Sequence, residues 1–252
     1  MGRVRRVHHA GAPDSEHRVV LDRDESKHVV RVLRLGPGDA VSVFDGQGRE
    51  WEGVLESTHG QEVRVCLGRE LTRPVDPTLE VVLFQALCRP DRMEWAIQKA
   101  TEVGVAEIRP IRSERVETRE PGPARLERWR RIAMEACKQS GRRRVPRVEL
   151  PEALPPAPPA GILALVLGSS PDSLPIGHYT LAEAPEAVWL AVGPEGGFSE
   201  EDRSLLEGRG WREAGLGPRT LRTETAGVVA ATLVLHAWAD LGAERTLPTP
   251  LG

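Results

Sequence analysis

A predicted strand, a glycine-rich loop and a predicted helix start follow one another without a break over residues 187–202. The run Ala187–Val192 is short, apolar and partly β-branched, which is typical of a buried strand. Ser199 and the three acidic residues after it are typical of a helix N-cap and first turn. Between them stand the three glycines of Gly193-Pro194-Glu195-Gly196-Gly197, where the backbone can approach another group closely. The unit indicates an α/β domain, and its loop is equally consistent with a tight turn and with a ligand-binding wall.

A second loop strengthens the ligand-binding interpretation. Residues 216–225 read Leu-Gly-Pro-Arg-Thr-Leu-Arg-Thr-Glu-Thr and lead into a helix predicted from Ala226 to about Leu241, whose start Thr223 or Thr225 can cap. This helix is apolar on nearly all sides and is therefore predicted to be buried. Its small residues permit close packing against another helix or against a second subunit, and the sequence favours neither.

The middle of the chain repeats the alternation of strands and helices. We expect a strand over residues 79–87, a helix over 91–103, a strand over 107–113 and a helix over 123–140, in which Trp129 belongs to the core. Residues 161–168 predict a further buried strand. Its carboxyl end is expected to form a third wall of the ligand site, because open α/β sheets bind ligands at that edge.

The N-terminal part has a different pattern. Residues 40–44 and 62–67 alternate or run apolar, and turns rich in glycine, proline and aspartate separate them. This pattern indicates a small β-barrel, and the composition equally permits any small β module. Prolines at 74 and 77 mark a connector. We therefore expect two domains, residues 1–72 and 73–252.

Composition narrows the class of protein. No apolar run is long enough to span a bilayer, and the N-terminus lacks the apolar block of a signal peptide, so we expect a cytoplasmic protein without a membrane partner. Cys66, Cys88 and Cys137 have no C-x-x-C spacing, and His8 and His9 are adjacent, so neither a disulfide framework nor a metal site is expected. We expect the cysteines to be buried or inert.

Arginines are concentrated locally although the net charge is −3. That balance argues against a protein that coats nucleic acid indiscriminately, but local clusters suit phosphate contacts at a defined RNA site. Solvated faces and local ion pairs are the alternative for each arginine. The candidate RNA contacts, among which the run 142–144 is the strongest, are Arg31, Arg34, Arg89, Arg142, Arg143 and Arg144.

Several segments together resemble the RsmE family. They are, in chain order, residues 28–34 (HVVRVLR), 92–105 (RMEWAIQKATEVGV), 127–133 (ERWRRIA), 135–142 (EACKQSGR), 193–202 (GPEGGFSEED) and 216–226 (LGPRTLRTETA). The resemblance implies methylation of uracil N3 of a uridine in the decoding region of 16S ribosomal RNA, in the small ribosomal subunit. It further implies a PUA-like RNA-binding domain followed by a SPOUT-type α/β domain with a deep trefoil knot, which binds S-adenosylmethionine and forms a homodimer.

The same resemblance assigns the cofactor site to the three predicted walls. Main-chain groups of the two loops are expected to do most of the binding, with Leu216 and Leu221 as an apolar bed for the adenine. The cofactor-binding residues expected on this basis are Leu167, Gly168, Gly193, Pro194, Glu195, Gly196, Gly197, Leu216, Gly217, Leu221, Arg222, Thr225 and Ala226.

Methylation of uracil N3 sets a chemical requirement, because this nitrogen carries a proton at neutral pH. The site must stabilise a uracil anion or supply a base. Arg222 is the first candidate for the charge role, since its guanidinium is permanently charged, although a salt bridge to Glu224 or Glu195 is the alternative. Glu195 is a candidate base, a carboxylate that offsets the sulfonium, or a brace for its loop. No separate base is needed if the field around the uridine lowers its pKa enough.

Two other classes compete with this interpretation. One is a non-catalytic RNA-binding ribosome assembly factor, which would not require the two intact loops. The other is a dinucleotide enzyme, since glycine-rich loops also hold pyrophosphates. The chain has no G-x-G-x-x-G after an early strand and no P-loop lysine, which disfavours it.

Overall fold

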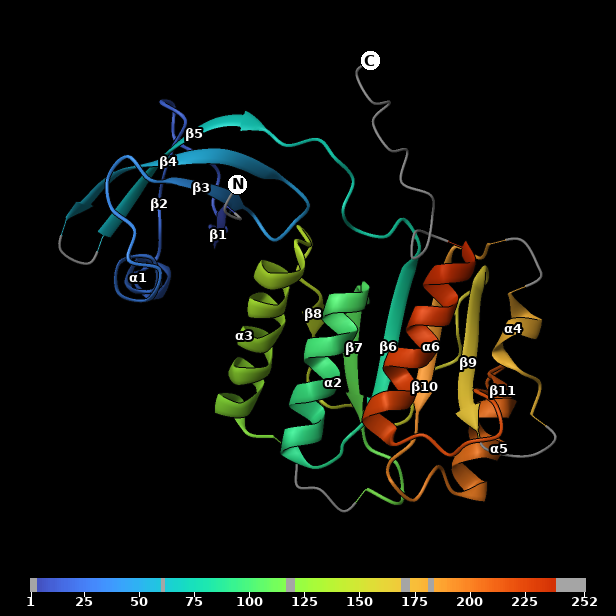
Figure 1. Ribbon diagram of the computed structural model, residues 1–252. Helices are drawn as coiled ribbons and strands as arrows, with labels where there is room; N and C mark the ends of the chain where they lie inside the picture. Colours follow the sequence, from blue (N-terminus) through green and yellow to red (C-terminus); the bar gives the residue numbers. More distant parts are fainter. Residues whose placement is uncertain (1–3, 60–61, 117–120, 169–172, 181–183, 239–252) are drawn as a thin grey trace. The chain divides into compact units, whose positions relative to one another are not determined.

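The computed structural model describes residues 4–59, 62–116, 121–168, 173–180 and 184–238 (Figure 1). The chain divides into two compact units. Unit 1 contains residues 1–76 and 133–145, and unit 2 contains residues 77–132 and 146–252. The helix α3 (Pro123–Ser140) therefore begins in one unit and ends in the other.

Unit 1 is built on a five-stranded sheet in the order β1-β3-β4-β5-β2. β1 pairs in parallel with β3, whereas β3–β4, β4–β5 and β5–β2 are antiparallel. Along β5, buried and exposed residues alternate, as expected for a strand with one face on a core. Valines and leucines of these strands form that core, with Val7, Val43, Leu55 and Val65 almost completely buried. The strands are β1 (Arg5–His8), β2 (Arg18–Val20), β3 (Ala40–Phe44), β4 (Glu50–His59) and β5 (Glu62–Glu70).

A short helix follows β2, where no element was expected. Asp22 caps α1 (Arg23–Lys27) by accepting hydrogen bonds from the amides of Asp24 and Glu25. The chain then continues through a π-helical turn, η1 (His28–Val32).

Buried ion pairs hold residues 133–145 within unit 1. The carboxylate of Glu50 accepts hydrogen bonds from Arg6 Nε (2.8 Å), Arg143 Nε (2.9 Å) and Ser42 Oγ (2.7 Å). Arg142 Nε donates to Asp76 at 3.1 Å. Lys138 and Glu25, which are both largely buried, form a further ion pair. A buried charge is tolerated only when it is paired, so these contacts fix the segment in place.

Unit 2 is built on a six-stranded parallel sheet in the order β11-β9-β10-β6-β7-β8. Most residues of its central strands are buried, because a parallel sheet is covered on both faces. The strands are β6 (Glu80–Ala86), β7 (Glu107–Ile111), β8 (Arg147–Val148), β9 (Ile162–Gly168), β10 (Ala187–Val192) and β11 (Arg212–Gly215).

Two helices pack side by side on this sheet, α2 (Pro90–Val103) and α6 (Thr223–Trp238) (Figure 1). Both begin at the carboxyl edge of the strands. α5 (Glu200–Gly208) follows β10 with a capping box between Ser199 and Asp202, which confirms the predicted helix start. A short α4 (Ile176–Tyr179) precedes β10 in the chain. Among the described helices, none combines the length and apolar character needed to cross a membrane.

The predicted strands and helices of unit 2 are confirmed with small shifts at their ends. α6 begins at Thr223, three residues earlier than expected, and the part of its prediction beyond residue 238 lies outside the described residues. Trp129 is buried, as predicted. Cys66 is exposed because it points outward from the alternating strand β5, so of the two expected properties, buried or inert, burial does not apply to it. Cys88 and Cys137 are buried.

Candidate functional site

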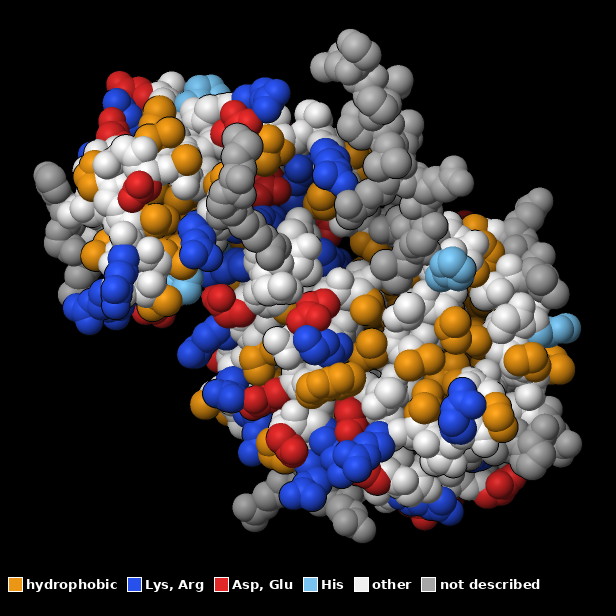
Figure 2. Space-filling view, viewed as in Figure 1, with side chains coloured by type: hydrophobic (Ala, Val, Ile, Leu, Met, Phe, Trp, Pro, Cys, Tyr) orange, Lys and Arg blue, Asp and Glu red, His pale blue; other side chains and the backbone are white. Residues whose placement is uncertain are grey.

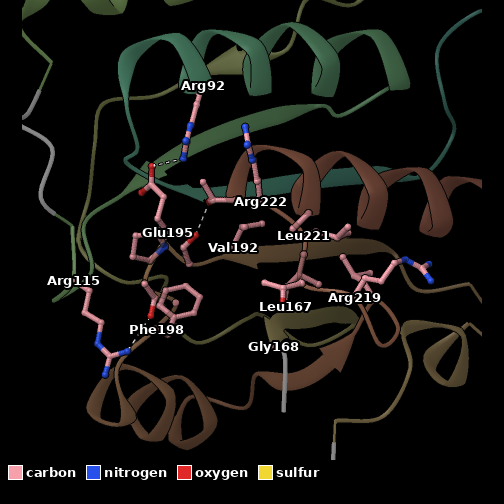
Figure 3. Close-up of a pocket in the computed structure, with 18 of the residues that line it drawn as sticks. Arg92, Arg115, Leu167, Gly168, Val192, Glu195, Phe198, Arg219, Leu221 and Arg222 are labelled. Atoms are coloured by element: carbon pink, nitrogen blue, oxygen red, sulfur yellow. Dashed lines mark hydrogen bonds and ion pairs between the residues drawn. The ribbon is translucent and has the colours of Figure 1, made fainter. Parts of the chain in front are cut away.

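Three neighbouring strands of unit 2 end at one cavity of about 520 Å³ (Figure 3). β9 ends at Gly168, β10 leads into the loop 193–197, and β11 leads into residues 216–222. These strands are adjacent in the order β11-β9-β10, so loops that are distant in sequence meet at one edge. Every residue expected to bind a cofactor lines this cavity except Thr225, which lines a neighbouring groove.

The glycines of the first loop have different reasons to be glycine. A Cβ on Gly193 would lie 2.9 Å from the backbone nitrogen of Phe198, so the turn itself excludes a side chain. Gly197 has φ +69°, and its amide donates to the Pro194 carbonyl at 2.9 Å. Gly196 has neither restriction, because the nearest atom to its Cβ would be Arg115 Cδ at 3.7 Å. The turn geometry therefore accounts for two of the glycines and not for Gly196.

A buried hydrogen-bond chain fixes the loop to the sheet and to α6. Thr223 Oγ1 donates to the Gly193 carbonyl at 2.6 Å and accepts from Gln85 Nε2 at 2.9 Å. Gln85 is fully buried near the carboxyl end of β6. The Thr223 hydroxyl thus orients the loop, where the sequence suggested a helix cap. Gln85 was missed, although a glutamine inside the apolar run 79–87 was the available signal.

Arg92, also missed by the sequence analysis, holds the carboxylates beside the cavity. It reaches from the first turn of α2 to Glu195 Oε1 at 3.0 Å and lies 3.8 Å from Glu224 Oε1 (Figure 3). Arg222 points up beside it from the start of α6 and has no ion pair within the described part of the chain. The salt bridge considered for Arg222 is therefore made by Arg92 instead. Arg115 is a further missed residue, and it donates to the Gly196 carbonyl at 3.0 Å.

The thiol of Cys88, near these carboxylates, is not a reactive nucleophile. Burial, helped by the negative charges of Glu195 and Glu224, raises the pKa of Cys88 to about 12. The thiol therefore stays protonated at neutral pH, and a thiolate nucleophile is not available there. Groups of three or more His, Cys, Asp or Glu side chains that could hold a metal ion are absent from the described residues.

The candidate RNA contacts fall into two sets. Arg142 and Arg143 are 4% and 6% exposed and pair with Asp76 and Glu50, so their charges are used within unit 1. Of the run 142–144, which was the strongest candidate from the sequence, only Arg144 is exposed. The exposed candidates are Arg31, Arg34, Arg89 and Arg144.

Two protein families match the chain, each over one region. The RNA methyltransferase domain family matches residues 75–235. The RNA methyltransferase PUA domain family matches residues 21–69.

Individual relatives cover most of the chain. A ribosomal RNA small subunit methyltransferase E from Mycobacterium bovis is 35% identical over 231 residues, which is 86% of this chain and 86% of that protein. The protein of the same name from Synechocystis is 33% identical over 221 residues, covering 85% of this chain and 72% of the relative. A crystal structure of ribosomal RNA small subunit methyltransferase E from Neisseria gonorrhoeae, bound to S-adenosyl methionine, is similar with a TM-score of 0.87. It is 29% identical, and the match covers 94% of this chain and 99% of that structure.

Proposed function

This chain belongs to the RNA methyltransferase family with a PUA domain, and from that membership we propose that it methylates uracil N3 of a uridine in 16S ribosomal RNA. The methyl donor is S-adenosylmethionine, and the target lies in the decoding region of the small ribosomal subunit. The observation that carries the proposal is the cavity of unit 2, whose walls are the GPEGG and LGPRTLRTETA loops. Such an RNA substrate places the reaction in the cytoplasm.

The residues around this cavity fit the proposed cofactor. Its volume of about 520 Å³ lies within the range of about 300–1,000 Å³ that is usual for small-molecule sites. Leu167, Leu216 and Leu221 offer apolar surface for an adenine, and exposed Gly196 leaves the loop backbone approachable. When bound, S-adenosylmethionine supplies an electrophilic methyl group on a sulfonium. The protein must then align the acceptor nitrogen with that methyl group and exclude water.

Arg222 and Glu195 have different proposed roles. The guanidinium of Arg222 lines the cavity without an internal ion pair among the described residues, so it is free to stabilise negative charge that develops on the uracil oxygens. Glu195 is tied to Arg92 at 3.0 Å, which supports a bracing role that holds the GPEGG loop against α2. Its negative charge also lies where it can offset a sulfonium.

The assembly of domains and subunits is part of the proposal. We assign RNA binding to residues 1–72 and methyl transfer to residues 73–252, a division supported by the ranges of the two family matches. A SPOUT-type trefoil knot is supported by the path of the chain, which returns from the edge strand β11 to place α6 over β6 and β10. Homodimerisation is supported by the apolar face around α6 (Figure 2), where Leu233 is 40% exposed.

Nucleoside mass spectrometry tests the proposal directly. Purified protein and S-adenosylmethionine are incubated with small ribosomal subunits that lack base methylation in the decoding region. We expect 3-methyluridine to appear in the 16S ribosomal RNA. Cofactor binding without this product would contradict the target, and the absence of both binding and product would favour a non-catalytic assembly factor.

A further inference from the structure

A second groove adjoins the cofactor cavity in unit 2. It has a volume of about 360 Å³ and shares Arg92 and Arg222 with the first cavity. Methyl transfer requires the donor carbon and the acceptor atom to approach in line at close range. The two shared arginines place this groove directly beside the cavity proposed for the donor. The groove is lined by Arg89, Asp91, Arg92, Trp95, Arg222, Glu224 and Thr225.

Glu224, which lines this groove, has a carboxylate oxygen without a hydrogen-bond partner among the described residues. The residue is 8% exposed, and its Oε2 atom is buried without a hydrogen-bond partner among the described residues. Its other oxygen lies 3.8 Å from Arg92 Nε. An unpartnered buried carboxylate oxygen is energetically costly, and a ligand that donates a hydrogen bond removes the cost. The geometry therefore calls for a donor at Oε2.

The hydrogen-bonding pattern of the groove matches one edge of uracil. The imide edge presents an N3–H donor between two carbonyl oxygens, O2 and O4. The groove offers the complement, a carboxylate acceptor from Glu224 together with guanidinium donors from Arg92 and Arg222. Cytosine has an unprotonated N3 and an amino group on this edge, so its pattern would leave Glu224 without a donor and put an amino group before a guanidinium.

An aromatic wall completes the groove. Trp95 is 41% exposed and lies one helical turn after Arg92 on α2. Exposed aromatic side chains in nucleic-acid sites stack on unpaired bases. Arginines gather at the same edge of unit 2, where α2 begins (Figure 2), and exposed Arg89 can meet a neighbouring phosphate.

We propose that this groove binds the acceptor uracil and that Glu224 is the catalytic base, an inference that rests on the proposed methyl transfer. The N3 proton passes to the carboxylate of Glu224 as the N3 electron pair forms a bond to the methyl carbon. The carbon–sulfur bond breaks, and its electron pair stays on sulfur as a neutral thioether. Arg92 and Arg222 stabilise the charge that develops on O2 and O4.

Replacement of Glu224 by glutamine tests the assignment, because the amide keeps the size and removes the proton acceptor. We expect the single-turnover rate of 3-methyluridine formation to fall about 100- to 10,000-fold, with unchanged affinity for S-adenosylmethionine by calorimetry. Glu94→Gln, which removes a half-buried carboxylate of α2 that pairs with Arg128, is the matched control and should leave the rate unchanged. A loss of less than threefold in E224Q would overturn the assignment. If the wild-type protein forms no 3-methyluridine, the proposed function itself has failed.

Trp95→Ala provides a second test of the proposed acceptor site if E224Q does not fold. The Trp95 side chain is largely outside the core, so the variant is expected to remain folded. Loss of one stacking contact should raise KM for the small subunit about tenfold with little change in kcat. An unchanged KM would exclude the groove as the acceptor site.

Discussion

The two units use arginine in opposite ways. In unit 1, Arg6 and Arg143 are enclosed, and both donate to the buried carboxylate of Glu50. In unit 2, Arg92 pairs with Glu195, but Arg222 lines two cavities and has no ion pair within the described residues. Arginine is thus a structural tie where an acid is folded against it, and Arg222, where none is, is the arginine that we propose contacts a ligand. The predictions below test whether this distinction decides what each charge does.

The largest effect is expected from Glu50→Ala. The substitution leaves two buried guanidinium groups without their shared partner, and breaking a buried ion pair costs about 3–5 kcal/mol. Urea unfolding measures the loss. Glu52→Ala, on the same strand but in an exposed pair with Arg69, is the control and should cost less than about 1 kcal/mol. Equal costs for the two variants would remove the distinction between buried and exposed pairs.

Arg222→Ala should lower the rate of methyl transfer and leave the stability unchanged, which is the opposite of the effect expected for Glu50→Ala. Because its charge is directed to the cavity, we expect kcat for methyl transfer to fall about 100- to 1,000-fold, while the free energy of unfolding stays within about 0.5 kcal/mol of wild type. Quench-flow methylation and urea titration measure the two quantities. Arg128→Ala removes an exposed arginine paired with Glu94 and should change neither. A destabilised R222A protein would mean that this arginine is a structural tie after all.

A substitution in the first loop separates an effect on cofactor binding from an effect on folding. Gly196→Val meets no backbone restriction, so we expect a folded protein that binds S-adenosylmethionine at least about tenfold more weakly, because the added side chain occupies the cofactor's approach. Isothermal titration calorimetry measures the affinity. Gly177→Val, at another glycine with open space around it, should bind normally. Unchanged affinity in G196V would place the cofactor away from this loop.

The smallest effect is expected from pH. Burial works to raise the pKa of Glu50, but hydrogen bonds from Arg6, Arg143 and Ser42 outweigh it and hold that pKa below its usual value. The stability that Glu50 contributes is therefore present above the ordinary carboxyl pKa and is lost as the pH falls through the lowered one. The gap in unfolding free energy between wild type and Glu50→Gln should narrow between neutral and strongly acidic solution. A gap that stays constant would contradict the ionised state of Glu50.

What the sequence could predict was local. The strand ending at Val192, the capping box at Ser199 and the two cavity loops depend on neighbours a few residues away, and they were correctly located. The structural ties depend on partners far along the chain. Arg92 meets Glu195 across 103 positions, and Arg143 meets Glu50 across 93. A row of arginines in the sequence does not reveal which of them is folded against an acid.

The hydrogen-bond chain from Gln85 through Thr223 to Gly193 also determines when, during synthesis, the protein becomes able to bind its cofactor. Its first and second members are 138 residues apart, and α6 follows every other part of the cavity in the chain. During synthesis the sheet strands leave the ribosome before α6 does, and a domain generally folds as a unit. A nascent chain without α6 lacks the hydroxyl that orients its glycine loop. Cofactor capture therefore becomes a late event that reports a completed fold.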